Sequence, residues 1–355
     1  MNIYKEALII MVKNDYRQFK KLPEIVKNDV DIALEAVKQN GVNLMRASKD
    51  LKNNKEIVLA AIRQDPTAIK YASPKLKDDK EVVLEAVAKN LHAMKSASKN
   101  MKNNKNIMLE LVELNGLCLQ YASDKLKNDK EIVTKAIKND AISLQYASDD
   151  LKNDRDIILE AIKTNALCLC HASDNLKNDK EIILEAIKEN ALSLKYASDN
   201  LKNDEEIVLE AIKRNDKVLE YASDSLKTNE KFIFNAVKIT GNIFLMMYIN
   251  DGVFTGKQLN QLFDNLHLRK KIKNDMIMKG FQYKIGINKD TKKFDSTEYC
   301  SNGLYFSNVL HINKFSNTEY GSDIYEVKLP DEAQVHLEDY DKAKADMIEI
   351  VRKVN

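Results

Sequence analysis

The hydrophobic positions of this chain recur every 25 residues over about two-thirds of its length. An Ala-Ser pair marks each repeat, and a Leu or Met follows three residues after the Ser. The pairs begin at Ala47, Ala72, Ala97, Ala122, Ala147, Ala172, Ala197 and Ala222, with no insertion between them. Such a fixed period is typical of helical repeat arrays, in which each repeat stacks on its neighbours.

The capping residues and apolar spacing of the repeat from residue 178 to residue 201 predict where its helices lie. Asn178 and Glu181 have the spacing of a capping box, so we expect a helix to begin there. At 100° per residue, its apolar side chains cover an arc of about 200°. These side chains are Ile182, Ile183, Leu184, Ala186 and Ile187. So wide an arc indicates a neighbour on each side.

A second helix is expected from about Ala191 to Ser198, capped by Asn190. Its inward side chains are predicted to be Leu192, Leu194, Tyr196 and Ala197, and Leu201 closes the loop to the next repeat. The equivalent residues Asp65 and Pro66 are a favourable N-cap and first helical residue. Gly41 and Gly116 occupy the position of Pro66. Each repeat is therefore predicted to be an antiparallel helix pair.

The composition changes near residue 250, where the repeat has faded. We predict a mainly α chain in which residues 1–250 form a right-handed-type α-solenoid of about nine repeats. Thr255 and Gln258 predict a connecting helix over residues 251–280, ending at Gly280. Strand-like alternation then predicts a small α+β module over residues 281–355. Its expected strands are 281–285, 303–306, 324–329 and 334–338, with a helix or strand over 343–354.

The segment from Leu176 to Ser198 reads LKNDKEIILEAIKENALSLKYAS. It resembles an uncharacterised 25-residue helical repeat family, a domain of unknown function from giant viruses and intracellular bacteria. The similarity covers about residues 22–245 and implies a repeat array with no assigned activity. Residues 283–288, 300–306 and 320–321 resemble a C-terminal module carried by giant-virus ankyrin-repeat proteins. The resemblance implies a viral or intracellular-bacterial source.

Charge and cysteine content narrow the possible partners. Fifty-six Lys and Arg against 54 Asp and Glu leave a formal net charge of +2, which argues against nucleic acid. The four cysteines form no CxxC pair, so a reducing compartment is expected. The apolar run from Ala7 to Val12 is too short to span a membrane. We therefore expect a cytoplasmic protein, in the host cytoplasm if the source is viral, with no membrane partner.

One variable position on the second helix is the predicted partner-binding surface, because repeat arrays bind through aligned exposed residues. Its members are Met45, Lys70, Lys95, Gln120, Gln145, Cys170, Lys195 and Glu220. The alternative is a solvated face under no constraint. The repeated Ser is interpreted as a helix cap. The Tyr that precedes the Ala in five repeats is interpreted as packing, with base stacking as its alternative. Arg46, Ser96 and His171 replace it in the other three repeats.

Two further motifs suggest chemistry without completing a site. Cys168, Cys170 and His171 form half of a metal motif, but their positions face different directions, so no metal is predicted. Gly303, Tyr305 and Phe306 resemble the G-x-Y-F strand of ADP-ribosyltransferases, in which the Tyr stacks on nicotinamide. No catalytic His or Glu accompanies that strand. Cys300 is interpreted as a small buried hydrophobic residue.

The function predicted from the sequence is a non-enzymatic protein-interaction scaffold whose solenoid surface binds a partner protein. No catalytic residue and no cofactor are predicted, and the sequence leaves a small-molecule ligand open. One alternative is an ADP-ribosyltransferase-like or nucleotide-binding C-terminal module. The other is RNA binding along the solenoid.

Overall fold

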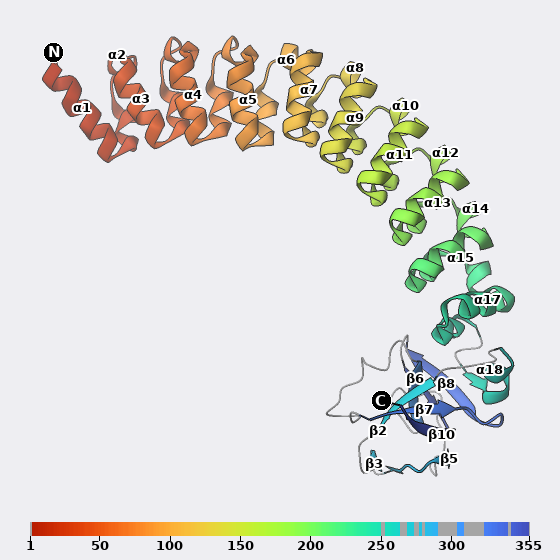
Figure 1. Ribbon diagram of the computed structural model, residues 1–355. Helices are drawn as coiled ribbons and strands as arrows, with labels where there is room; N and C mark the ends of the chain where they lie inside the picture. Colours follow the sequence, from red (N-terminus) through yellow and green to blue (C-terminus); the bar gives the residue numbers. More distant parts are fainter. Residues whose placement is uncertain are drawn as a thin grey trace. The chain divides into compact units, whose positions relative to one another are not determined.

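The computed structural model describes residues 2–249, 253–262, 268–272, 277–278, 281–289, 304–308, 323–339 and 342–354. The chain forms two compact units, Met1–Asn190 and Ala191–Asn355. In the first unit, helices stack one after another in chain order (Figure 1). The second unit joins the last repeats to a small antiparallel sheet. The expected helical repeat array is therefore confirmed.

Each interior repeat contains three helical segments where two were predicted. A short helix leads into a longer α helix, and a 3-10 helix follows. The longer helices are α1 (Asn2–Asn14), α3 (Val30–Gln39), α4 (Lys55–Gln64), α5 (Lys80–Lys89), α7 (Lys105–Leu114), α9 (Lys130–Asn139), α11 (Arg155–Thr164), α13 (Lys180–Glu189), α15 (Glu205–Arg214) and α17 (Glu230–Thr240). The six-residue 3-10 helices are η1 (Tyr16–Lys21), η2 (Gly41–Arg46), η4 (Pro66–Tyr71), η6 (Leu91–Ser96), η7 (Gly116–Tyr121), η8 (Ala141–Tyr146), η9 (Ala166–His171), η10 (Ala191–Tyr196), η11 (Asp216–Tyr221) and η12 (Ile243–Tyr248). The short helices are α2 (Glu24–Lys27), η3 (Leu51–Asn53), η5 (Leu76–Asp78), α6 (Lys99–Asn103), α8 (Asp124–Lys127), α10 (Asp149–Lys152), α12 (Asp174–Lys177), α14 (Asp199–Lys202) and α16 (Asp224–Lys227).

The longer helix begins one residue later than its predicted cap. Asp179, not Asn178, is the N-cap of α13, and its carboxylate accepts from the N–H groups of Glu181 at 3.0 Å and Ile182 at 3.1 Å. Asn178 instead ends the short helix α12. Two cap-type residues stand side by side here, and only the second has the extended backbone that an N-cap requires.

The second helix of each repeat is a 3-10 helix, which changes the predicted inward face. In η10, Leu194 is fully buried, while Leu192, predicted to point inward, is 38% exposed. A 3-10 helix has three residues per turn, so residues 191, 194 and 197 share one buried face. Leu192 and Lys195 share another, exposed face. The cap predicted at Asp65 is confirmed, since its carboxylate accepts from Thr67 N at 2.8 Å.

The repeated Ser ties consecutive repeats together, as well as capping a helix as predicted. Ser148 Oγ accepts from Leu151 N at 3.3 Å, at the start of α10. The same hydroxyl donates to Asn128 Oδ1 in the preceding repeat at 2.5 Å. Ser148 N donates to Lys127 O at 2.9 Å. One small side chain thus caps its own repeat and bonds to the previous one.

The first residue of each 3-10 helix meets the backbone of the following α helix. A Cβ on Gly41 would overlap the carbonyl oxygen of Ala61, and a Cβ on Gly116 would overlap that of Ala136. Accordingly, η2 and η7 pack more closely on the next α helix than η8 and η9, which begin with Ala. Glycine at these two positions therefore allows the close approach of η2 and η7 to the next α helix.

Ion pairs link the start of one α helix to the N-cap of the next. Lys130 Nζ lies 2.9 Å from Asp154 and 3.1 Å from Asp156. Burial alone would raise the pKa of Asp154, but hydrogen bonds from Lys130 and from the N–H of Ile157 outweigh it and lower that pKa below its usual value. Equivalent pairs lower the pKa of Asp29, Asp79 and Asp129. The array therefore contains a row of carboxylates that are stabilised in the charged form.

These carboxylates predict that the protein loses stability in acid. A depressed pKa contributes stability above the ordinary Asp value of about 3.9, and that contribution disappears as the pH falls through the folded-state value. Asp154→Asn should weaken this acid loss while keeping the cap, because Asn54 and Asn104 cap their helices in the same way. Melting temperatures recorded from neutral pH to about pH 3 test this. An unchanged acid loss in Asp154→Asn would contradict it.

The C-terminal region is an eight-stranded antiparallel sheet in the order β1-β8-β9-β6-β2-β7-β10-β5, with a separate hairpin of β3 and β4. Alternate side chains such as Val335 and Leu337 are buried. This alternation is expected of an antiparallel sheet that buries one of its two faces. The strands are β1 (Val253–Thr255), β2 (Leu268–Ile272), β3 (Ile277–Met278), β4 (Phe281–Gln282), β5 (Gly286–Lys289), β6 (Leu304–Asn308), β7 (Asp323–Lys328), β8 (Gln334–Asp339), β9 (Lys342–Ala345) and β10 (Met347–Val354).

The connecting helix predicted over residues 251–280 is wrong beyond its first turns. The Thr255 and Gln258 capping box is present, with Gln258 N donating to Thr255 Oγ1 at 3.2 Å. However, α18 (Gly256–Leu262) has only seven residues. Leu268–Ile272 pairs with β7 as β2, so sheet pairing overrides the helix propensity of Leu, Arg and Lys. Gly280, the predicted stop, lies outside the described residues.

Within the second unit, the sheet covers the end of the array. Strand β8 contacts η12, the last 3-10 helix. A terminal repeat needs such a cover, because its apolar face has no following repeat to pack against. The division between the two units, at Asn190, falls inside the array.

Candidate partner-binding surface

The eight predicted partner-binding residues all lie at the fifth position of their 3-10 helices. Five are exposed, namely Met45, Lys70, Lys95, Lys195 and Glu220. Gln120, Gln145 and Cys170 are half-buried. Lys195 and Glu220 belong to the second unit and the others to the first. Within the first unit their alignment follows from the repeat, because consecutive 3-10 helices contact each other from η6 to η9.

Sequence reasoning missed a second exposed position in the same helices. Leu117, Ile142 and Leu167 precede the predicted residues by three and therefore lie beside them on a 3-10 helix. Ile142 is 47% exposed, and the other two are half-buried. The signal was the three-residue spacing, which is visible in the sequence once the helix type is known.

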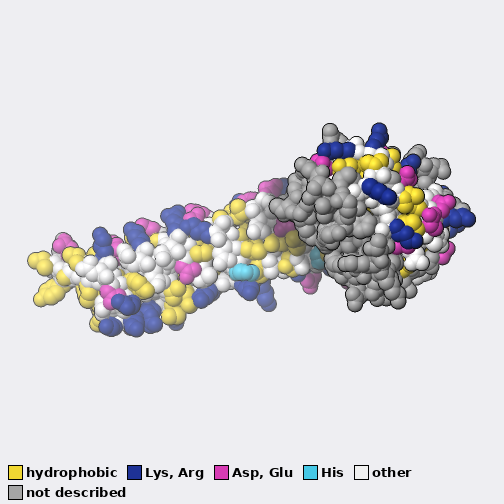
Figure 2. All heavy atoms as spheres, turned by 90° about the horizontal axis from the view of Figure 1, so that it is seen from below, with side chains coloured by type: hydrophobic (Ala, Val, Ile, Leu, Met, Phe, Trp, Pro, Cys, Tyr) yellow, Lys and Arg dark blue, Asp and Glu magenta, His cyan; other side chains and the backbone are white. Residues whose placement is uncertain are grey.

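The half-buried residues that end η7, η8 and η9 complete this surface. With the two neighbouring positions they form what we name the uncharged strip. The uncharged strip consists of Leu117, Gln120, Tyr121, Ile142, Gln145, Tyr146, Leu167, Cys170 and His171. It contains no Lys, Arg, Asp or Glu, although these residues make up 31% of the chain. Figure 2 shows hydrophobic and histidine side chains on one face of the array, with Lys and Arg gathered toward its edges.

Burial favours the neutral form of three titratable groups in the uncharged strip. Burial, with smaller effects from Lys152 and Lys177, lowers the pKa of His171 below its usual 6.5. Burial raises the pKa of the Cys170 thiol and, with smaller effects from neighbouring groups, that of Tyr121.

Basic residues precede the uncharged strip along the same row. Lys70 Nζ lies 4.8 Å from the centre of the Tyr71 ring, a cation–π contact. In the next repeat, His92 Nδ1 lies 2.9 Å from the Tyr121 hydroxyl, which joins η6 to the strip. Arg46 and Lys95 are exposed on the same row. The row thus changes from basic to neutral along the first unit.

Nothing in the described residues gathers into a metal site. No three His, Cys, Asp or Glu side chains lie close enough together within those ranges to hold an ion. Cys168 is buried, and burial raises its pKa to about 12, so its thiol is inert. The Cys168-Cys170-His171 motif is therefore split between the core and the uncharged strip.

The predicted C-terminal motif is only partly described. Cys300 and Gly303 lie outside the described residues. Tyr305 and Phe306 belong to β6, which pairs with β2 and β9. Their backbone fits the strand that was expected there.

None of the helices in the described residues combines the length and the apolar character needed to cross a membrane.

The repeat pattern matches one family model along most of the array. The matched segments are residues 4–52, 29–77, 54–102, 104–152, 129–177, 154–202, 179–227 and 204–251. Successive segments start 25 residues apart, except that those starting at 54 and 104 are 50 residues apart. Neither the curated proteins nor the solved structures gave a match. The matched segments cover more than half of the chain, which therefore belongs to the family described as Domain of unknown function (DUF4116).

Proposed function

We propose that this protein is a non-enzymatic interaction scaffold whose uncharged strip binds a partner protein. The observation that carries the proposal is the contrast between the strip and the rest of the surface. Three consecutive repeats present Leu, Ile, Tyr and Gln side chains without a charge, in a chain with 31% charged residues. The centres of protein interfaces are depleted of charge and enriched in aromatic residues in the same way.

The remaining repeated positions have structural roles that account for them. The Ser hydroxyls cap helices and bond to the preceding repeat, and the Asp carboxylates cap helices and pair with Lys. The Ala that begins each Ala-Ser pair is buried. The residue types at the exposed positions of the 3-10 helices can therefore differ between repeats and serve recognition.

The alternatives have less support. RNA binding along the row would need positive charge beside the Tyr side chains. Lys70 and Lys195 supply it at Tyr71 and Tyr196, but the uncharged strip itself contains no Lys or Arg. A nucleotide-binding C-terminal module would depend on Cys300 and Gly303, which lie outside the described residues. We therefore place recognition on the array.

Ile142→Lys should weaken partner binding at least tenfold, because it places a charge at the centre of the uncharged strip, where a partner would exclude water. The measurement is affinity capture with the full chain, followed by titration of the captured partner against each variant. Tyr146→Ala should act in the same direction.

The matched control for this experiment is Val30→Lys. Val30 is 41% exposed and occupies the position where Lys55 and Lys130 stand in other repeats. The control adds the same charge at a similarly exposed apolar residue away from the uncharged strip. If the partner binds Ile142→Lys and Val30→Lys equally well, the strip is not its binding surface.

A further inference from the structure

The junction between α5 and α7 departs from the packing of its neighbours. Leu91 stands at the start of η6, where Gly41 and Gly116 allow close approach in other repeats. Leu111 stands in the following α helix at the position of Ala61 and Ala136, and it is fully buried. Two large side chains therefore occupy the repeat positions where small ones stand on both sides of the boundary in other repeats. As a result, α5 and α7 pack less closely than α7 and α9.

The ion-pair row is also interrupted at this junction. Lys55 lies 2.9 Å from both Asp79 and Glu81 in the next repeat. Lys80, its counterpart one repeat later, faces Asn104 and Asn106 in the sequence pattern and so lacks these two carboxylates. Its Nζ instead reaches Glu110 on α7 at 2.6 Å.

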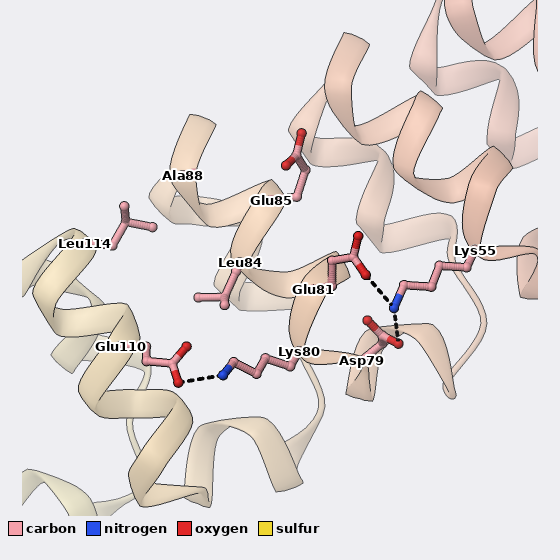
Figure 3. Close-up of a pocket in the computed structure, with 9 residues that line it drawn as sticks. All are labelled: Lys55, Asp79, Lys80, Glu81, Leu84, Glu85, Ala88, Glu110 and Leu114. Carbon is pink, nitrogen blue, oxygen red and sulfur yellow. Dashed lines mark hydrogen bonds and ion pairs between the residues drawn. The ribbon is translucent and has the colours of Figure 1, made fainter.

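A groove of about 700 Å³ lies between the two helices. Its apolar part consists of Leu84, Ala88 and Leu114, and Figure 3 shows Leu84 and Leu114 pointing into the space between α5 and α7. Ala88 replaces the Lys found at residues 38, 138 and 163, so no long side chain crosses the groove there. Leu114 is 47% exposed. Volumes of this size are typical of binding pockets.

The charges around the groove have an acidic excess. Four carboxylates line it, those of Asp79, Glu81, Glu85 and Glu110, against the two ammonium groups of Lys55 and Lys80. The Arg63 guanidinium lies 3.2 Å from Glu85, so the excess is one negative charge. The Lys80 and Glu110 side chains are 52% and 42% exposed, so their ion pair is screened and easily exchanged for another. Glu110 can therefore accept a cation from outside the chain.

We propose that this groove binds a basic amphipathic helical segment of a partner protein. An apolar side chain of the segment would contact Leu84, Ala88 and Leu114. A Lys or Arg one turn away would replace Lys80 at Glu110. Helices commonly bind in grooves with apolar anchors at i and i+4 in this manner. The site lies on the α helices and uses no residue of the uncharged strip.

The test uses the full chain and a fluorescent peptide of about 15 residues, long enough to form a helix. The peptide contains only Leu and Lys, with Leu on one helical face, and a Leu and Glu peptide of the same pattern is the comparison. We expect saturable binding of the basic peptide by fluorescence anisotropy and at least tenfold weaker binding of the acidic one.

Three variants separate this site from the rest of the surface. Leu114→Lys and Ala88→Lys should each weaken binding of the basic peptide at least tenfold, and Ala88→Lys only restores a residue found in other repeats. Ile142→Lys, which changes an equally exposed apolar side chain in the uncharged strip, should leave binding unchanged. No saturable binding, or equal weakening by all three variants, would overturn the proposal. Because partner capture by the uncharged strip is measured separately, failure here leaves that function intact.

Discussion

Leu144→Ala should lower the free energy of unfolding by about 2–5 kcal/mol, the usual cost of truncating a buried leucine. Leu144 lies in η8 and is fully buried, with 0% of its surface accessible to water. Truncation removes its packing contacts and leaves a cavity between repeats. Urea denaturation followed by circular dichroism measures the loss.

The same substitution at Leu114 provides the control. That side chain is 47% exposed, so Leu114→Ala should change stability by no more than about 0.5 kcal/mol. Because each repeat contacts mainly its neighbours, Leu144→Ala should also broaden the unfolding transition by weakening the array at one point. A variant as stable as Leu114→Ala would show that η8 contributes little to the core.

The repeat itself could be predicted from the sequence because every repeat solves the same packing problem. The Ala-Ser pair recurs since the Ala is buried and the Ser caps a helix, and both roles tolerate few other residues. Asp65 followed by Pro66 likewise marked a true helix start. Repetition confirmed each of these signals several times over.

The type of the second helix could not be predicted in this way. Six residues such as Ala191–Tyr196 make less than two turns of an α helix, too few to distinguish a period of 3.6 from one of 3. The error placed Leu192 in the core and hid the exposed position that Leu117, Ile142 and Leu167 share. The uncharged strip was therefore only partly predicted, through Gln120, Gln145 and Cys170.

The α5–α7 groove was not predicted, because its cause is not visible as a motif. Leu91 and Leu111 are ordinary apolar residues in an array rich in leucine. Their effect depends on the positions they occupy, one against the other across a repeat boundary. Only the structure shows that Gly41 and Gly116 are there to allow close approach. From the sequence, these glycines could only be placed at the helix-start position of Pro66.

Gly116→Leu should lower the free energy of unfolding by about 1–3 kcal/mol, the usual cost of overpacking a core. A Cβ at residue 116 would overlap the carbonyl oxygen of Ala136, which belongs to the backbone of α9 and cannot rotate away. The two repeats must therefore separate, as they do beside Leu91. The bond from Gly116 N to Asn139 Oδ1, now 2.8 Å, should lengthen. Urea denaturation gives the stability, and a crystal structure of the variant gives the spacing.

Gly116→Ala completes the series, because Ala141 and Ala166 occupy the same position in later repeats with looser packing. The free energy of unfolding of Gly116→Ala should fall between those of the native protein and Gly116→Leu. A graded loss of stability with side-chain size would show that this one position sets the spacing between repeats. If Gly116→Leu is as stable as the native protein, then the spacing is set elsewhere, and the groove between α5 and α7 needs another cause than Leu91.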